Sequence, residues 1–206
     1  MGSDTTGFEG TAGRLAGAVM ARLNRDMEDA AIDELDPGAA DCVLAVGFGP
    51  GVGIAGLLAR LPGGLVAGID PSSAMLEQAR RRNRVAVDAG RACLVEAGAA
   101  AIPWPDRTFH GAVAVNSIQL WDPFDASLRE VARVLAPGAA LVTLTHRWAI
   151  ERRAPVTEWT EATTAQLRDR GFEAVGCKTA RYRSGEGVLL RARRSTSPCC
   201  GDRAAA

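Results

Sequence analysis

The stretch VLAVGFGPGVG, residues 43–53, decides the fold of this chain. It begins as a short run of aliphatic residues, which is typical of a buried β-strand, and it ends in glycines at alternate positions: Gly47, Gly49, Gly51 and Gly53. Glycines allow positive φ angles and leave no side chain between the backbone and whatever lies against it. We therefore expect a first strand over residues 41–47, followed by a loop that cradles a nucleotide-like cofactor.

The glycine loop departs from the dinucleotide-binding fingerprint. That fingerprint reads G-x-G-x-x-G, whereas this loop reads G-x-G-x-G, because Val52 stands where the third glycine is required. A glycine-rich loop by itself does not identify its ligand, so the assignment depends on the residues that follow.

The composition limits the possible partners. The 206 residues are enough for one α/β domain, and 24 basic residues balance 24 acidic ones, so nothing favours binding to nucleic acid or to an anionic membrane. Lys178 is the only lysine, which excludes a Walker A phosphate loop and leaves a Schiff-base enzyme with a single candidate. A small-molecule substrate is the expectation, and the oligomeric state is left open.

The ends of the chain and its cysteines indicate a cytoplasmic protein. No apolar run approaches membrane-spanning length, and the first ten residues lack the basic flank and apolar segment of a signal peptide. The five cysteines include no C-x-x-C pair and are expected to be reduced and structural, although the vicinal pair Cys199–Cys200 leaves a soft-metal site as an alternative. We expect flexible segments over residues 1–10 and 195–206 around one domain, residues 11–194.

Helical and strand patterns alternate along the domain. Helices are expected over residues 11–35, 54–61, 71–83, 126–135 and 158–170, and strands over residues 41–47, 65–70, 91–97, 112–116, 140–145, 172–182 and 187–192. Strands joined by helices predict a doubly wound parallel sheet with right-handed crossovers. The turn over residues 184–187 predicts a terminal hairpin, which adds one antiparallel strand.

Four segments, taken in order, resemble the class I S-adenosylmethionine-dependent methyltransferases. They are VLAVGFGPG at residues 43–51, GIDPSSAMLEQA at 68–79, IPWPDRTFHGAVAVNSI at 102–118 and REVARVLAPGAAL at 129–141, with RGF at 170–172 as a weaker fifth. The resemblance spans about residues 24–192. It implies a three-layer α/β/α fold with a seven-stranded sheet in the order 3-2-1-4-5-7-6, strand seven antiparallel, and a ligand site beyond the carboxyl ends of the parallel strands.

The resemblance also implies S-adenosylmethionine as cofactor and S-adenosylhomocysteine as product. Asp70 ends the second strand about twenty residues after the glycine loop, where a carboxylate accepts hydrogen bonds from a ribose diol. The other residues expected to contact the cofactor are Gly47, Gly49, Gly51, Pro71, Ser72, Met75, Ala97, Gly98, Ala99 and Asn116. Helix capping at Asp70 and core packing of Met75 are the competing structural roles.

Two positions depart from the family pattern. Family members often carry an acid at the position of Ala45, where it anchors the aminoacyl end of the cofactor, and Asp at the position of Gly98, where it meets the adenine amino group. Glu96 and the backbone of Ala97 and Ala99 are the candidates to replace the second contact. These departures leave an alternative open, in which the protein is a methyltransferase-like relative that binds the cofactor with little or no turnover.

Residues after the fourth and fifth strands are expected to meet the substrate. Gln119, Trp121 and Arg147 are the candidates, and the Trp121 ring suits a cation–π contact with a sulfonium. His146, at the end of the fifth strand, is the candidate general base, with a structural role as the alternative. A nucleotide-dependent oxidoreductase is the enzymatic alternative, and the missing G-x-G-x-x-G and Tyr-x-x-x-Lys patterns argue against it.

Overall fold

The computed structural model describes residues 24–196, which form a single seven-stranded sheet in the order β3-β2-β1-β4-β5-β7-β6. The strands are β1 (Cys42–Val46), β2 (Leu65–Asp70), β3 (Ala92–Glu96), β4 (Phe109–Val115), β5 (Leu135–His146), β6 (Phe172–Tyr182) and β7 (Gly185–Arg194). The first five strands are parallel, and β7 runs antiparallel to both β5 and β6. The strand order and the antiparallel strand are confirmed.

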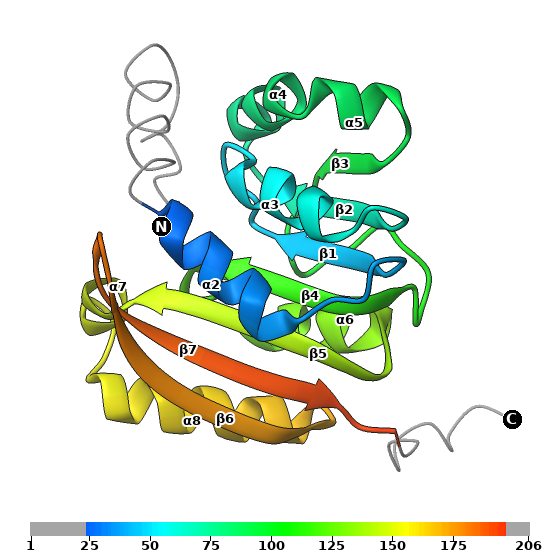
Figure 1. Ribbon diagram of the computed structural model, residues 1–206. Coiled ribbons are helices and arrows are strands. Elements are labelled where there is room, and N and C mark those ends of the chain that lie inside the picture. Colours follow the sequence, from blue (N-terminus) through cyan, green and yellow to red (C-terminus); the bar gives the residue numbers. More distant parts are fainter. Residues whose placement is uncertain (1–23, 197–206) are drawn as a thin grey trace, which may run out of the picture.

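Helices cover both faces of this sheet (Figure 1). They are α2 (Arg25–Leu35), α3 (Val52–Arg60), α4 (Ser73–Arg82), α5 (Arg84–Asp88), the 3-10 helix η2 (Ile118–Leu120), α6 (Phe124–Val134), α7 (Arg147–Glu151) and α8 (Val156–Asp169). Two buried apolar clusters fill the spaces between the layers: α2, α3 and α4 pack on one face, and α6 and α8 on the other. Among residues 24–196, no helix is both long and apolar enough to cross a membrane.

Strand β1 lies inside the sheet and is buried on both of its faces. Val43 and Ala45 belong to the cluster under α2 and α3, whereas Leu44 and Val46 belong to the cluster under α6 and α8. A strand covered on both sides reads as a continuous apolar run rather than as an alternation. This burial explains the aliphatic run that opens the glycine stretch.

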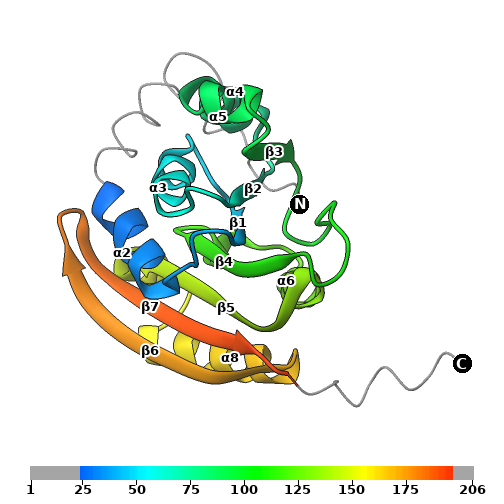
Figure 2. The ribbon, with the colours of Figure 1, turned by 45° about the vertical axis from the view of Figure 1, so that its right-hand side comes forward.

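Helix α2 extends along the face of the sheet beside α3 and above β7 (Figure 2). The sequence predicts a helix over residues 11–35, and the described part of it is α2; residues 11–23 lie outside the described residues. Met27, Ala31 and Ile32 of α2 are completely or almost completely buried. The apolar face of α2 therefore covers β4, β5 and β7.

The strand boundaries differ from the expected ones around Pro137–Gly138. Strand β5 starts at Leu135 rather than at residue 140, and β4 starts at Phe109 rather than at residue 112. Phe109 pairs with Leu135 and Gly111 with Ala140, so an irregularity in β5 absorbs the Pro-Gly pair without ending the strand. The final turn is also tighter than expected, because Tyr182 already pairs with Gly185.

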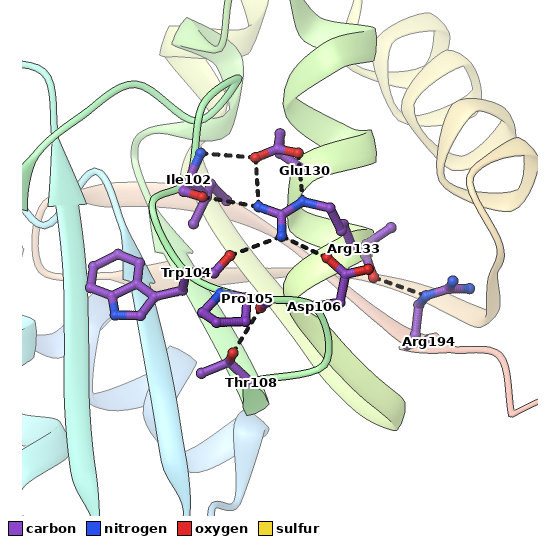
Figure 3. Close-up of polar contacts among 9 residues, drawn as sticks. Ile102, Trp104, Pro105, Asp106, Thr108, Glu130, Arg133 and Arg194 are labelled. Atoms are coloured by element: carbon purple, nitrogen blue, oxygen red, sulfur yellow. Dashed lines mark hydrogen bonds and ion pairs between the residues drawn. The ribbon is translucent and has the colours of Figure 1, made fainter.

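One arginine joins two of the segments that carry the family resemblance (Figure 3). Arg133 of α6 donates hydrogen bonds to the backbone oxygens of Ile102 (2.9 Å) and Trp104 (2.8 Å), to Asp106 (2.8 Å) and to both carboxylate oxygens of Glu130. The carboxylates of Glu130 and Asp106 raise the pKa of Arg133 above its ordinary value. Arg133 thus fixes the loop that connects β3 to β4.

Candidate functional site

The glycine loop leaves β1 and lies against the end of β2. The backbone amides of Gly47 (2.8 Å) and Phe48 (3.3 Å) donate to the carbonyl oxygen of Ile69. Gly47, Gly49 and Gly51 all have positive φ angles, of 73°, 53° and 79°. The backbone conformation therefore requires glycine at each of these three positions.

The three glycines have different surroundings. A Cβ atom on Gly47 would lie 2.5 Å from Cβ of Ser117, and one on Gly51 would lie 2.7 Å from Cβ of Ala79, so both glycines pack against the protein. A Cβ atom on Gly49 would meet no atom within 4 Å. Gly49 is therefore the glycine whose backbone is left uncovered beside the carboxyl end of β1.

Asp70 connects the glycine loop to α4. Its Oδ2 accepts a hydrogen bond from the Gly49 amide (2.8 Å) and its Oδ1 accepts one from the Ser72 amide (3.0 Å). The residue is 7% exposed, and burial raises the pKa of Asp70 although the two amides act in the opposite direction. Each carboxylate oxygen has a second lone pair, so Asp70 retains acceptor capacity for a ligand hydroxyl.

Two groups of predicted cofactor residues border Asp70. Ser72 is the N-cap of α4 and accepts from the Met75 amide (3.4 Å), Pro71 is exposed, and Met75 is buried. Ala97, Gly98 and Ala99 follow β3, and the Ala97 amide donates to the Asp70 carbonyl oxygen (3.1 Å). Gly98 is exposed and a Cβ atom there would meet nothing within 4 Å. Both groups thus lie at the carboxyl ends of β2 and β3.

Asn116 organises the carboxyl end of β4. It has a positive φ of 52°, its Oδ1 accepts from the His146 amide (2.9 Å), and its Nδ2 lies 3.9 Å from Sδ of Met27. The next residue, Ser117, donates to the Val46 carbonyl oxygen (2.6 Å). Asn116 therefore joins the ends of β4 and β5 to α2, next to the glycine loop.

His146 is buried, with 5% of its surface exposed. Its Nε2 lies 3.0 Å from Oδ1 of Asn24, its Nδ1 has no hydrogen-bonding partner among the described residues, and its ring stacks on Trp148. Burial lowers the pKa of His146, and the backbone of Glu186 and the charge of Asp26 oppose this shift. Burial favours the neutral ring, but a substrate would reach Nε2 only if Asn24 moved, so the role of His146 as a base stays a prediction.

The predicted substrate residues separate into two groups. Gln119 is buried and donates from Nε2 to the Asn116 carbonyl oxygen (2.9 Å). Trp121 packs on Phe124, and its buried indole nitrogen has no hydrogen-bonding partner within residues 24–196. Arg147 is half-exposed and pairs with Glu151 (2.7 Å) and Glu186 (3.2 Å). Gln119 and Trp121 therefore lie near Asn116, whereas the guanidinium of Arg147 is engaged at the surface.

The helix over residues 11–35 is expected to border the substrate, but sequence reasoning did not single out the residues that α2 contributes to the site. Asn24 reaches His146, Met27 reaches Asn116, and the Glu28 carboxyl lies against Gly53 in the first turn of α3. The helical period of residues 25–35 predicts which face is buried, but not which strand ends that face will meet. The fourth glycine, at position 53, was the one signal that a close neighbour was present.

The described residues show no metal centre. No group of three or more His, Cys, Asp or Glu side chains is placed to hold a metal ion within residues 24–196. Cys42, Cys93 and Cys177 are free thiols, and Cys199 and Cys200 lie outside the described residues.

Comparison with known proteins shows similarity to methyltransferases. Residues 43–138 match the family model described as a methyltransferase domain. The uncharacterized methyltransferase YdaC of Bacillus subtilis is 28% identical over 162 residues, which cover 78% of this chain and 87% of YdaC. The putative methyltransferase YrhH of the same organism is 30% identical over 114 residues, which cover 55% of this chain and 62% of YrhH.

Solved structures give the same fold. A putative S-adenosyl-L-methionine-dependent methyltransferase from Methanococcus maripaludis superposes with a TM-score of 0.74 at 16% identity, over 97% of this chain and 99% of that protein. The doubly wound sheet, the glycine loop and the acid at the end of β2 define a nucleotide-cofactor-binding α/β protein. Within that class, residues 43–138 match the methyltransferase-domain model, and the chain is similar to methyltransferases over most of its described length.

Proposed function

We propose that this protein transfers the methyl group of S-adenosylmethionine to a small-molecule acceptor. The observation that carries the proposal is the contact between Asp70 and the Gly49 amide, which holds a buried carboxylate beside an uncovered glycine backbone. A carboxylate at this place suits a ribose diol, and a glycine with no neighbour leaves room for the rest of a nucleoside.

The residues around Asp70 fit the other parts of the cofactor. Ser72 and Met75 lie on one side of the proposed ribose position, and the loop of Ala97, Gly98 and Ala99, which is exposed at Gly98, offers backbone hydrogen-bonding groups to an adenine edge. Asn116, with its backbone strained at positive φ, lies on the side of the glycine loop where the methyl donor would face its acceptor.

The chemistry requires positioning more than acid–base catalysis. When bound, S-adenosylmethionine supplies a methyl group already activated on a sulfonium. The protein's task is then to hold donor and acceptor in line and to exclude water. A base is needed only for an acceptor atom whose proton has a high pKa, and His146 is the candidate for that role once Asn24 moves away from its Nε2.

Two short segments border the acceptor side. Helix α2 approaches the ends of β4 and β5 through Met27 and Asn24, and the segment from α7 to the start of α8 follows β5 directly. Both segments are short, and residues 24–196 contain no inserted domain that would enclose a large substrate. This arrangement favours a small acceptor.

Calorimetric titration with S-adenosylmethionine, S-adenosylhomocysteine and NADH tests the cofactor. We expect both sulfur compounds to bind and NADH not to bind. Binding of NADH alone would instead indicate the oxidoreductase alternative and refute the proposal.

Turnover needs a separate experiment. The protein is incubated with isotopically labelled methyl donor and a metabolite extract, and mass spectrometry searches for a compound that gains one labelled methyl group. We expect such a product together with S-adenosylhomocysteine. Cofactor binding without any methylated product would favour the binding protein without turnover, which the alanine at position 45 keeps open.

A further inference from the structure

Glu28 has an unusual position on α2. Its Oε2 lies only 2.3 Å from the place that a Cβ atom on Gly53 would occupy, so the carboxyl fills the space left by the missing side chain. Within residues 24–196, the carboxyl of Glu28 has no hydrogen bond or ion pair. Desolvation, helped by the charge of the neighbouring Asp29, raises the pKa of Glu28 to about 8. The carboxyl is therefore crowded against α3 without a cationic partner.

The part of α2 that carries Glu28 adjoins the proposed cofactor site. Asn24, one turn earlier, contacts His146 at the end of β5, and Met27 contacts Asn116 at the end of β4. Gly53 lies two residues after Gly51, in the first turn of the helix that follows the glycine loop. Glu28 is partly exposed, and it contacts the helix that follows the glycine loop while its neighbours on α2 contact the carboxyl ends of β4 and β5.

The amino-acid end of S-adenosylmethionine carries an ammonium group that needs an acceptor. Asp70 already accepts two backbone amides and is proposed to hold the ribose. Asp26 accepts the amides of Met27 and Arg183. Ala45 is buried on the face of β1 that α2 and α3 cover, and its methyl group accepts no hydrogen bond. Among these candidates, only the Glu28 carboxyl is without a hydrogen-bonding or ionic partner within the described residues.

We propose that Glu28 accepts a hydrogen bond from the ammonium group at the aminoacyl end of S-adenosylmethionine. Glu28, on α2, would then serve in place of the acid that is absent at position 45. This inference rests on the proposed function. Gly53 has a role in the same arrangement, since any side chain there would displace the carboxyl. A cation beside a desolvated carboxyl favours its charged form, so the ligand relieves the unfavourable burial.

The test is a calorimetric comparison of two ligands on three proteins. The ligands are S-adenosylhomocysteine and its analogue in which hydrogen replaces the amino group. The proteins are the wild type, Glu28→Gln, which keeps the shape of the side chain, and Asp29→Asn, which removes the same charge from the adjacent, exposed position. Circular dichroism confirms that each variant is folded.

We expect the wild type to bind S-adenosylhomocysteine at least about ten-fold more tightly than the analogue, as a charge-assisted hydrogen bond predicts. Glu28→Gln should lose this preference by weakening only the binding of S-adenosylhomocysteine. Asp29→Asn should keep it. If Glu28→Gln does not fold, Gly53→Ala, which displaces the carboxyl, is expected to lose the preference instead.

Three results would overturn the assignment. Equal binding of both ligands by the wild type, or a full preference retained by Glu28→Gln, removes Glu28 from the ammonium site while the proposed function stands. Equal weakening of both ligands by Glu28→Gln would mean that Glu28 only shapes the fold. If the wild type binds neither ligand, the proposed function itself fails.

Discussion

The Oδ2 atom of Asp70 accepts a hydrogen bond of 2.8 Å from the backbone amide of Gly49, across the carboxyl ends of β1 and β2. The two residues belong to different sequence motifs, yet this hydrogen bond joins the glycine loop to a buried carboxylate. The loop and the acid therefore act as one binding element rather than as two separate signals.

Replacing Asp70 with asparagine tests whether its charge binds the ligand, separately from its hydrogen bond to the glycine loop. Asparagine keeps one acceptor oxygen for a backbone amide but loses the charge that a ribose diol would meet. We expect the affinity for S-adenosylhomocysteine to fall about ten-fold or more, because hydrogen bonds to charged groups contribute about 1.5–3 kcal/mol. Calorimetry measures this change.

The matched control for this variant is Asp41→Asn. Asp41 also accepts a backbone amide, from Gly38 (2.8 Å), but it lies before β1, at the opposite end of the sheet. The affinity of Asp41→Asn should equal that of the wild type. An unchanged affinity in Asp70→Asn would show that the ribose assignment is wrong.

Gly49→Ala tests whether the uncovered glycine faces the ligand. Alanine at a φ of 53° is strained by about 1–2 kcal/mol, but its Cβ would meet no protein atom within 4 Å. We expect a modest loss in the free energy of unfolding, measured with urea, and a larger loss of affinity for S-adenosylhomocysteine, because the methyl group enters the proposed ligand space.

Gly90→Ala is the control for Gly49→Ala. Gly90 also has a positive φ, of 68°, and also has no neighbour within 4 Å, but it lies in the turn before β3 at the amino end of the strand. Its substitution should lower stability by a similar amount and leave ligand affinity unchanged. Equal affinities for the two variants would contradict the placement of the ligand beside Gly49.

The sequence predicts the fold well because each strand of a doubly wound sheet has a recognisable local sequence pattern. Continuous apolar runs such as residues 43–46 and 65–70 mark strands buried on both faces, and the glycine and proline turns mark their ends. The short helices α5 and α7, of five residues each, were missed because they hold too few residues to show a helical period. The predicted start of β5 was wrong because a Pro-Gly dipeptide usually ends a helix or strand, whereas Pro137–Gly138 lies within β5 at an irregularity of the strand.

The site is predictable only where it depends on the local backbone. Gly47, Gly49 and Gly51 have the positive φ angles that their spacing suggests, and Asp70 lies at the end of its strand as expected. The difference between the packed Gly51 and the uncovered Gly49 depends on α4, which folds against the loop from elsewhere in the chain. The contact of Glu28 with Gly53 likewise joins two helices, and no local pattern encodes it.

The Arg133 network should stabilise the fold more than a surface ion pair does. Arg133→Gln removes hydrogen bonds to two backbone carbonyl oxygens and to two carboxylates, and leaves partly buried acceptors of the β3–β4 loop unpaired. We expect urea unfolding to show a loss of about 2–3 kcal/mol. Arg129→Gln, on the same helix, breaks only an exposed pair with Asp125 and should change stability little. Equal effects of the two variants would mean that the network does not hold the loop.

The raised pKa of Glu28 predicts a specific dependence of stability on pH. Glu28 titrates near 4.5 when unfolded and at about 8 when folded, so the folded state holds its proton more tightly. The resulting stabilisation is fully present below pH 4.5 and is lost as the pH rises to 8. Burial lowers the pKa of His146 instead, so the change in stability that His146 causes occurs below pH 6.5. The interval from pH 6.5 to 8 therefore isolates Glu28.

Over this interval we expect the free energy of unfolding of the wild type, measured with urea without ligand, to fall by about 1–2 kcal/mol. Glu28→Gln should show a nearly flat profile there, and a wild-type profile that is equally flat would show that the carboxyl is not desolvated against Gly53.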